Sequence, residues 1–128
     1  PGETEADFGA TLDVCRAAGF SRIHVFPYSP RPGTPAAAAP DRVPREVARG
    51  RSRRLQALGD ELRDAFHRRF LGATVPVLCE TRTADGLWDG HDPRYIPVRF
   101  PGPPGLRGRI LPVRLERLSG ARVLGRGA

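Results

Sequence analysis

The sequence lacks lysine and methionine altogether and has few cysteines and aromatic residues, the latter only 7% of the chain. The two cysteines, Cys15 and Cys79, are 64 residues apart in unlike contexts, which excludes a disulfide framework and a C-x-x-C metal site. No apolar run approaches the roughly 20 residues that a bilayer-spanning helix needs. Neither a Walker loop nor a G-x-G-x-x-G motif is present. The sequence therefore predicts a protein that is neither membrane-spanning nor built on these nucleotide-binding loops.

The sequence also has no initiator methionine and no secretory leader, in which a charged segment would precede an apolar one. We therefore expect the chain to be processed or to be cut from a longer protein. Because cysteine is scarce and no leader is recognisable, we expect a reducing, cytoplasmic location without a membrane. The oligomeric state is left open.

What the sequence has in excess is arginine. All 21 basic residues are arginines, against 14 acidic residues, which gives a net charge of +7. The excess is zero over residues 1–50, +3 over residues 51–73 and +4 over residues 74–128. Guanidinium groups suit phosphate, so this charge favours a polyanionic partner. A genome that is rich in arginine codons would give the same composition, and a purely compositional origin stays open as an alternative.

The N-terminal segment predicts one helix and one strand. Thr4 and Asp7 resemble an imperfect capping box, and Gly19 is suited to end the helix. The apolar residues of 22–26 then predict a short strand. A helix and one parallel strand are half of a βαβ unit, which needs neighbouring strands that this chain lacks. The segment is therefore interpreted as the edge of an incomplete α/β domain.

The rest of the chain predicts a linker, a long helix and a small barrel. Prolines exclude regular structure over residues 28–44, and an amphipathic pattern predicts a helix from Pro44, as its first residue, to about Leu71. Five short apolar runs separated by glycine and proline turns predict a five-stranded antiparallel barrel of the oligonucleotide-binding type. The expected strands are 74–81, 86–90, 95–100, 109–118 and 121–124.

Residues of the predicted barrel favour RNA as the partner. Guanidinium groups neutralise phosphates, and exposed aromatic rings stack on unpaired bases. The candidate RNA-binding residues are Arg82, Arg94, Tyr95, Arg99, Arg107, Arg109 and Arg114, with Trp88 and Phe100 interleaved among them. No catalytic or metal-binding set is predicted, because His24, His67 and His91 are scattered over different elements. They are interpreted as a packed strand residue, a solvated helix residue and a turn residue. Cys79 is expected to be a buried core residue.

Four segments together resemble the C-terminal part of radical S-adenosylmethionine (SAM) methylthiotransferases. They are P-G-E-T-E-A-D-F at 1–8, H-V-F-P-Y-S-P-R-P-G-T-P-A at 24–36, R-S-R-R-L at 51–55 and G-H-D-P-R-Y-I-P-V-R-F at 90–100. The second segment is most similar to the branch that modifies N6-threonylcarbamoyladenosine in tRNA. The isopentenyladenosine branch shares the Y-S-x-R-P-G-T-x-A core and is the nearest alternative. A third branch, which modifies a ribosomal protein, usually has an acidic residue where Arg31 stands.

The resemblance implies an α+β organisation in three parts. Residues 1–40 resemble the C-terminal edge of the partial (β/α) radical SAM barrel, residues 41–72 form a linker and a long helix, and residues 73–128 resemble the tRNA-binding TRAM barrel. It also implies that Glu3, Val25, Phe26 and Tyr28 contact S-adenosylmethionine in the parent enzyme.

The resemblance further implies that the parent enzyme carries iron-sulfur clusters, whose C-x-x-x-C-x-x-C ligands are absent here. We therefore expect this fragment alone to bind no cofactor, to be inactive, and to serve mainly in binding tRNA. One alternative function stays open besides the isopentenyladenosine branch, namely a free-standing basic RNA-binding module. The third interpretation is an interaction domain whose arginine content only reflects the composition of the genome.

Overall fold

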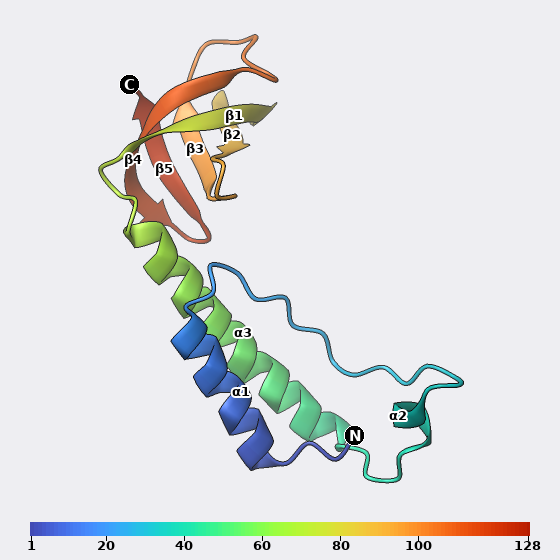
Figure 1. Ribbon diagram of the computed structural model, residues 1–128. Helices are drawn as coiled ribbons and strands as arrows, with labels where there is room; N and C mark the ends of the chain where they lie inside the picture. The colour runs from blue at the N-terminus through green and yellow to red at the C-terminus, as the bar shows by residue number, and fades with distance from the viewer. The chain divides into compact units, whose positions relative to one another are not determined.

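The computed structural model describes all residues from Pro1 to Ala128 and contains three helices followed by five strands (Figure 1). The helices are α1 (Glu5–Ala18), α2 (Pro35–Ala38) and α3 (Arg45–Arg68), and the strands are β1 (Thr74–Arg82), β2 (Leu87–His91), β3 (Pro97–Pro101), β4 (Ile110–Ser119) and β5 (Arg122–Gly127). The chain divides into two compact units, Pro1–Arg63 and Asp64–Ala128, called the first and second units below. The predicted α+β class is confirmed.

Helix α1 has the two ends that the sequence predicts. The Thr4 side chain accepts a hydrogen bond from the Asp7 backbone N–H at 3.1 Å, and the Asp7 carboxylate accepts one from the Thr4 N–H at 2.9 Å. The capping box is therefore complete rather than imperfect. At the other end Gly19 adopts the left-handed conformation, with φ 62°, and its N–H donates to the carbonyl of Cys15.

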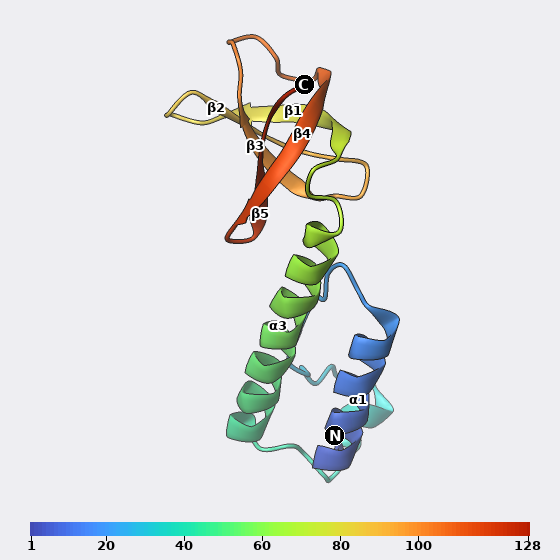
Figure 2. The same ribbon diagram turned by 90° about the vertical axis from the view of Figure 1, so that its left-hand side faces the viewer.

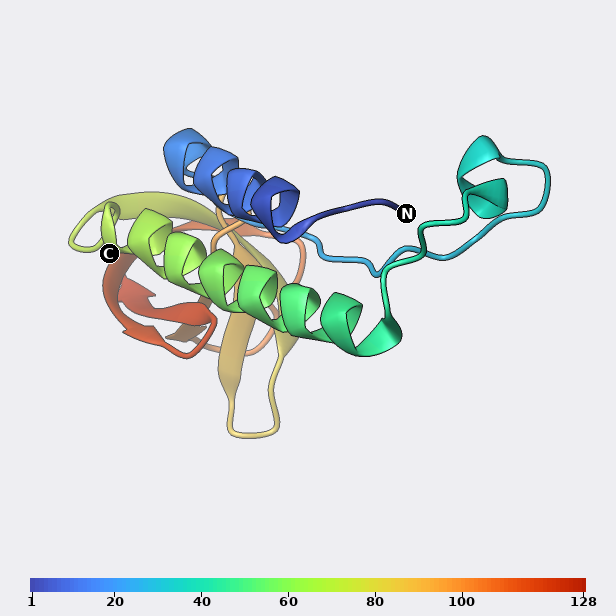
Figure 3. The same cartoon turned by 90° about the horizontal axis from the view of Figure 1, so that it is seen from below.

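The first unit is held by the packing of α1 on the first part of α3. The buried residues Phe8, Leu12 and Cys15 of α1 meet Leu58 of α3. Figures 1, 2 and 3 show the two helices side by side and running in the same direction, so that the segment 19–44 returns along them. Ile23 on this segment contacts the same cluster. Because the two helices run in the same direction, the end of α1 and the start of α3 are far apart, and a long segment must connect them.

The strand expected at residues 22–26 is not formed, and this prediction is wrong. The segment is irregular, and no backbone-to-backbone hydrogen bond involves residues 20–30. Its apolar residues match the hydrophobic pattern of a short strand, but a strand also needs a neighbour that pairs with its N–H and C=O groups. Within these 128 residues no such neighbour is provided. His24, expected to be packed in this strand, is exposed.

The second unit contains a closed barrel with the strand order β1-β2-β3-β5-β4, in which β1 also pairs with β4 (Figure 2). All five expected strands are present, and their bounds differ from the predicted ones by at most three residues. Four of the five pairings are antiparallel, but β3 and β5 pair in parallel through Val98↔Val123 and Arg99↔Leu124. The expectation of a purely antiparallel barrel is wrong at this one seam. Closure of a Greek-key barrel brings these two strands together in the same direction.

Alternating residues of the strands fill the barrel. Fully buried side chains include Val77, Cys79, Val98, Phe100 and Leu115. Cys79 is a core residue, as expected, and burial raises the pKa of its thiol. The C-terminal turn of α3 and the residues after it, with Phe66, Phe70 and Leu71, pack against this core. His67 is therefore buried rather than solvated, which corrects its predicted position.

The boundary between the two units falls inside α3, since the apolar stripe of this helix serves two cores. Leu55, Leu58 and Leu62 face the first core, and Phe66 belongs to the second. The threefold division at residues 40 and 72 stays a prediction about domains. None of the helices has the length and apolar character that crossing a membrane requires.

Candidate nucleic-acid interface

The turn between β2 and β3 is organised by one buried carboxylate. The Asp92 side chain is fully buried, and its Oδ1 accepts hydrogen bonds from the backbone N–H groups of Arg94 (2.8 Å) and Ile96 (3.0 Å). Its Oδ2 forms an ion pair with the Arg94 guanidinium at 2.8 Å. That guanidinium also lies 4.5 Å from the ring centre of Phe70, a cation–π distance. Arg94, a predicted RNA contact, is thus held by partners within its own unit.

Tyr95 is presented to solvent by this turn. It is the only residue other than glycine with a positive φ, 61°, and it is 80% exposed. Its N–H donates to the carbonyl of Asp92, and its ring centre lies 6.4 Å from that of His91. Such a conformation costs a side chain about 1 kcal/mol or more, and it persists where the surroundings enforce it. The predicted stacking residue is therefore accessible and fixed in place.

Trp88 and Phe100, the other two aromatic residues proposed to line the RNA surface, lie inside the barrel. Trp88 is 3% exposed and Phe100 2%. The indole N–H of Trp88 donates to the carbonyl of Pro103 at 2.9 Å, which satisfies its polar group. The expectation that these rings alternate with arginines on the surface is wrong, because side chains of a strand alternate between its two faces.

Arg99 is engaged in a charge cluster on the outer surface of β2, β3 and β5. Its guanidinium forms two hydrogen bonds of 2.7 Å to the carboxylate of Asp89, the residue directly opposite on β2. Arg122 contacts the same carboxylate at 3.0 Å. Hydrogen bonding from Arg99 is the main reason that the pKa of Asp89 is lowered, and the pair raises the pKa of Arg99. Two arginines around one carboxylate leave one positive charge at this spot.

Four other predicted contacts are exposed arginines that make no ion pair. Arg82 ends β1, Arg114 lies in β4, and Arg107 and Arg109 lie in the loop before β4. Because no carboxylate offsets their charge, they are well suited to exchange counterions for phosphates. The sequence identified them, but it did not distinguish them from Arg94 and Arg99, whose charges are partly neutralised.

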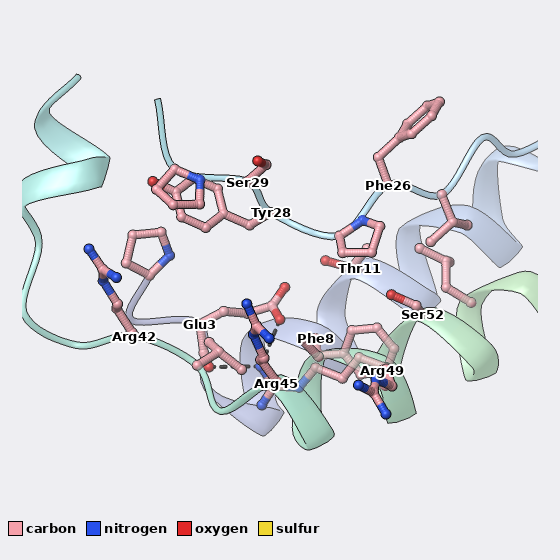
Figure 4. Close-up of a pocket in the computed structure, with 18 residues that line it drawn as sticks. Glu3, Phe8, Thr11, Phe26, Tyr28, Ser29, Arg42, Arg45, Arg49 and Ser52 are labelled. Carbon is pink, nitrogen blue, oxygen red and sulfur yellow. Dashed lines mark hydrogen bonds and ion pairs between the residues drawn. The ribbon is translucent and has the colours of Figure 1, made fainter. Parts of the chain in front are cut away.

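The four residues expected to contact S-adenosylmethionine all line one open depression of the first unit. Glu3, Val25, Phe26 and Tyr28 lie around it together with Arg42, Arg45, Arg49 and Ser52 of the region that begins α3 (Figure 4). The rings of Phe26 and Tyr28 are exposed. The structure therefore brings these four residues together, although the strand expected at residues 22–26, which would carry Val25 and Phe26, is absent.

Glu3 has a partner that no sequence motif indicated. Arg51 is nearly buried, and its guanidinium binds the Glu3 carboxylate at 2.7 Å, the Glu3 carbonyl at 2.8 Å and the Glu5 carboxylate at 3.4 Å. Glu5 also contacts Arg54, and this contact is the main cause of its lowered pKa. The only sequence signal was the R-S-R-R segment, in which nothing marked Arg51 as the buried member.

The residues of this chain do not provide a site for an iron-sulfur cluster. Cys15 and Cys79 are both buried, and they lie in different units. No three histidine, cysteine or acidic side chains converge as metal ligands would. A cluster with thiolate ligands needs several converging cysteines, and these 128 residues do not supply them.

No family model matches the sequence, but named relatives do. The chain is 42% identical over 117 residues to the tRNA-2-methylthio-N(6)-dimethylallyladenosine synthase of Syntrophotalea carbinolica, which covers 90% of this chain and 27% of the relative. It is 40% identical over 123 residues to the enzyme of the same name from Chloroflexus aurantiacus, covering 93% of this chain and 26% of the relative. The chain thus spans about a quarter of the length of these relatives.

The chain is therefore similar to part of tRNA-modifying enzymes, and the predicted resemblance to tRNA methylthiotransferases is confirmed. Both relatives are named for dimethylallyladenosine, which is isopentenyladenosine. The expected likeness to the threonylcarbamoyladenosine branch is not supported, and the relatives favour the isopentenyladenosine alternative. The expectation rested on the H-V-F-P-Y-S-P-R pattern at residues 24–31.

Proposed function

We propose that this chain is part of a tRNA methylthiotransferase that forms 2-methylthio-N6-dimethylallyladenosine, and that its barrel holds the tRNA. The observation that carries the proposal is the identity of 40% or more with two synthases of that name over at least 90% of this chain. The basic excess of +4 in residues 74–128 supports the role of the barrel, because tRNA is a polyanion. The first unit contributes one side of the cofactor pocket.

In this proposal the depression of the first unit faces S-adenosylmethionine. Residues 25–28 have backbone groups that no strand uses, which suits them to hydrogen bonding with an adenine. The rings of Phe26 and Tyr28 add apolar surface. Arg51 positions Glu3 by binding both its carboxylate and its carbonyl. The iron-sulfur clusters, which supply the radical chemistry, are held by residues outside this chain.

The first prediction tests the reaction. The reading frame that encodes this chain, extended upstream, is expected to contain a C-x-x-x-C-x-x-C triplet. Expressed in cells that lack their own methylthiotransferase, the encoded protein should produce 2-methylthio-N6-dimethylallyladenosine, measured by mass spectrometry of digested tRNA. A product based on threonylcarbamoyladenosine would overturn the substrate assignment. A start codon within a few residues of Pro1 would instead support a free-standing RNA-binding module.

The second prediction tests the barrel arginines by the salt dependence of tRNA binding. Arg109→Ala should weaken binding about equally for all tRNAs and reduce the slope of log affinity against log salt by about one unit, because one phosphate contact is lost. Arg99→Ala should reduce the slope less, since two hydrogen bonds to Asp89 already occupy the Arg99 guanidinium and leave it less able to contact a phosphate. Filter binding across a salt series measures both slopes. Equal slopes in wild type and Arg109→Ala would show that Arg109 makes no phosphate contact in the complex with tRNA.

A further inference from the structure

Three neighbouring strands place one exposed side chain each in a single row on the outer surface of the barrel. His91, the last residue of β2, pairs with Leu78 of β1, and Leu78 pairs with Ile110, the first residue of β4. Directly opposite residues have Cβ atoms about 5 Å apart. Leu78 is 40% exposed and Ile110 is 66% exposed. Tyr95 extends the row beyond His91, since their rings are neighbours. Tyr95, His91, Leu78 and Ile110 are called the outer row below.

The outer row is costly for the fold to maintain. Leu78 and Ile110 expose apolar surface to water, although outward-facing strand positions accept polar residues equally well. Tyr95 occupies a backbone conformation that glycine or asparagine adopts with less strain. The buried carboxylate of Asp92 enforces this conformation through the two N–H groups that flank Tyr95. Ile110 and Tyr95, the most exposed members of the row, therefore contribute little to the packing of the barrel and are available to a ligand.

The charges beside the outer row indicate the kind of ligand. Arg109 immediately precedes Ile110, and Arg107 lies two residues earlier in the same loop. Both are exposed and without an ion pair. The loop is fixed against β1, since the N–H of Gly108 donates to the carbonyl of Cys79 and the N–H of Cys79 donates to the carbonyl of Arg109. Glu80, an acidic residue that contacts the row, is paired with Nδ1 of His91 at 2.6 Å.

We propose that the outer row binds the unpaired bases of an RNA loop, with Tyr95 and His91 as the stacking surface and Leu78 and Ile110 as an apolar floor. Arg107 and Arg109 contact the phosphates of the same stretch. Exposed rings next to unpaired guanidinium groups are the combination by which single-stranded nucleic acid is bound without sequence preference. The proposal rests on the proposed function of the barrel and adds which surface carries it and which part of the tRNA it contacts.

The test compares Tyr95→Gly with wild type in binding an RNA stem-loop and a fully paired duplex of equal length. Glycine accepts the positive φ, so the variant keeps the turn and should melt at the same temperature or higher. We expect stem-loop binding to weaken by about 5- to 150-fold, with an unchanged salt slope, because stacking rather than charge is lost. Tyr95→Phe should bind as wild type. Duplex binding should be the same in all three proteins.

A second pair of variants tests the apolar floor. Threonine is β-branched and compatible with a strand, so Ile110→Thr and Leu78→Thr should preserve the barrel. Each should weaken stem-loop binding several-fold, because apolar contact surface is lost. Val14→Thr is the matched control, because Val14 is similarly exposed on α1 and lies in the other unit. It should leave binding unchanged.

A 2-aminopurine in the RNA loop reports stacking independently of affinity. Wild type should quench its fluorescence, and Tyr95→Gly should not.

Two results would overturn this inference separately from the proposed function. If wild type binds the stem-loop and Tyr95→Gly, Ile110→Thr and Leu78→Thr bind it equally well, the barrel holds tRNA elsewhere and the outer row has another role. If in addition wild type self-associates in sedimentation and these variants do not, the row is a protein interface. If wild type binds neither RNA, the proposed function of the barrel fails as well.

Discussion

Replacing Gly90 with alanine is expected to destabilise the barrel by about 3 kcal/mol, because β1 leaves no space for a side chain at this position. A Cβ on Gly90 would overlap the carbonyl oxygen of Leu78 and approach Cγ1 of Val77 to 3.1 Å. The first of these atoms belongs to the backbone and yields only if the two strands separate. Gly90 lies where β1 changes register, between Cys79 and Thr81, so the strands approach closely at a bulge.

Gly127→Ala is the matched control, since Gly127 also lies in a strand but has no atom within 4 Å of the built Cβ. It should change the free energy of unfolding by no more than about 0.5 kcal/mol. Urea unfolding followed by the fluorescence of Trp88, the single tryptophan, measures both variants. A Gly90→Ala protein as stable as Gly127→Ala would mean that β1 and β2 do not pair as described.

Asp92→Ala is the second change with a large expected effect. It should lower the free energy of unfolding by about 3 kcal/mol. The change leaves the N–H groups of Arg94 and Ile96 without an acceptor and removes the ion-pair partner of Arg94. Each unsatisfied buried donor costs about 1–3 kcal/mol, and loss of a buried ionic partner adds to this. Chemical denaturation of the whole chain gives the value.

Asp92→Asn separates the two contributions at this turn. The amide oxygen can still accept from both N–H groups, but the charge that balances Arg94 is gone. We expect an intermediate loss of about 1–2 kcal/mol. Arg94→Ala should also lose less than Asp92→Ala, because the Asp92 carboxylate keeps both of its backbone N–H donors. A loss in Arg94→Ala as large as in Asp92→Ala would contradict the view that the backbone N–H groups dominate.

Much of the local structure was predictable because it depends on residues close in sequence. Thr4, Asp7 and Gly19 define the ends of α1 through contacts within four residues. Glycine and proline turns separated the five strands, and the alternation of β1 from Val75 to Cys79 reflects one buried face. The candidate RNA-binding set was only partly predictable, since Tyr95 is exposed as expected and Trp88 is not.

The sequence by itself determined the α+β class, the helix ends, the approximate strands and the concentration of positive charge in the helix and barrel. Only the tertiary structure decided which groups are available on the surface. Closure of the barrel put Trp88 inside, set Asp89 against Arg99 and Arg122, and aligned Leu78 between His91 and Ile110. Local periodicity tells which residues share a face of a strand, whereas pairing across 10 to 33 residues of sequence depends on how the strands close into a barrel.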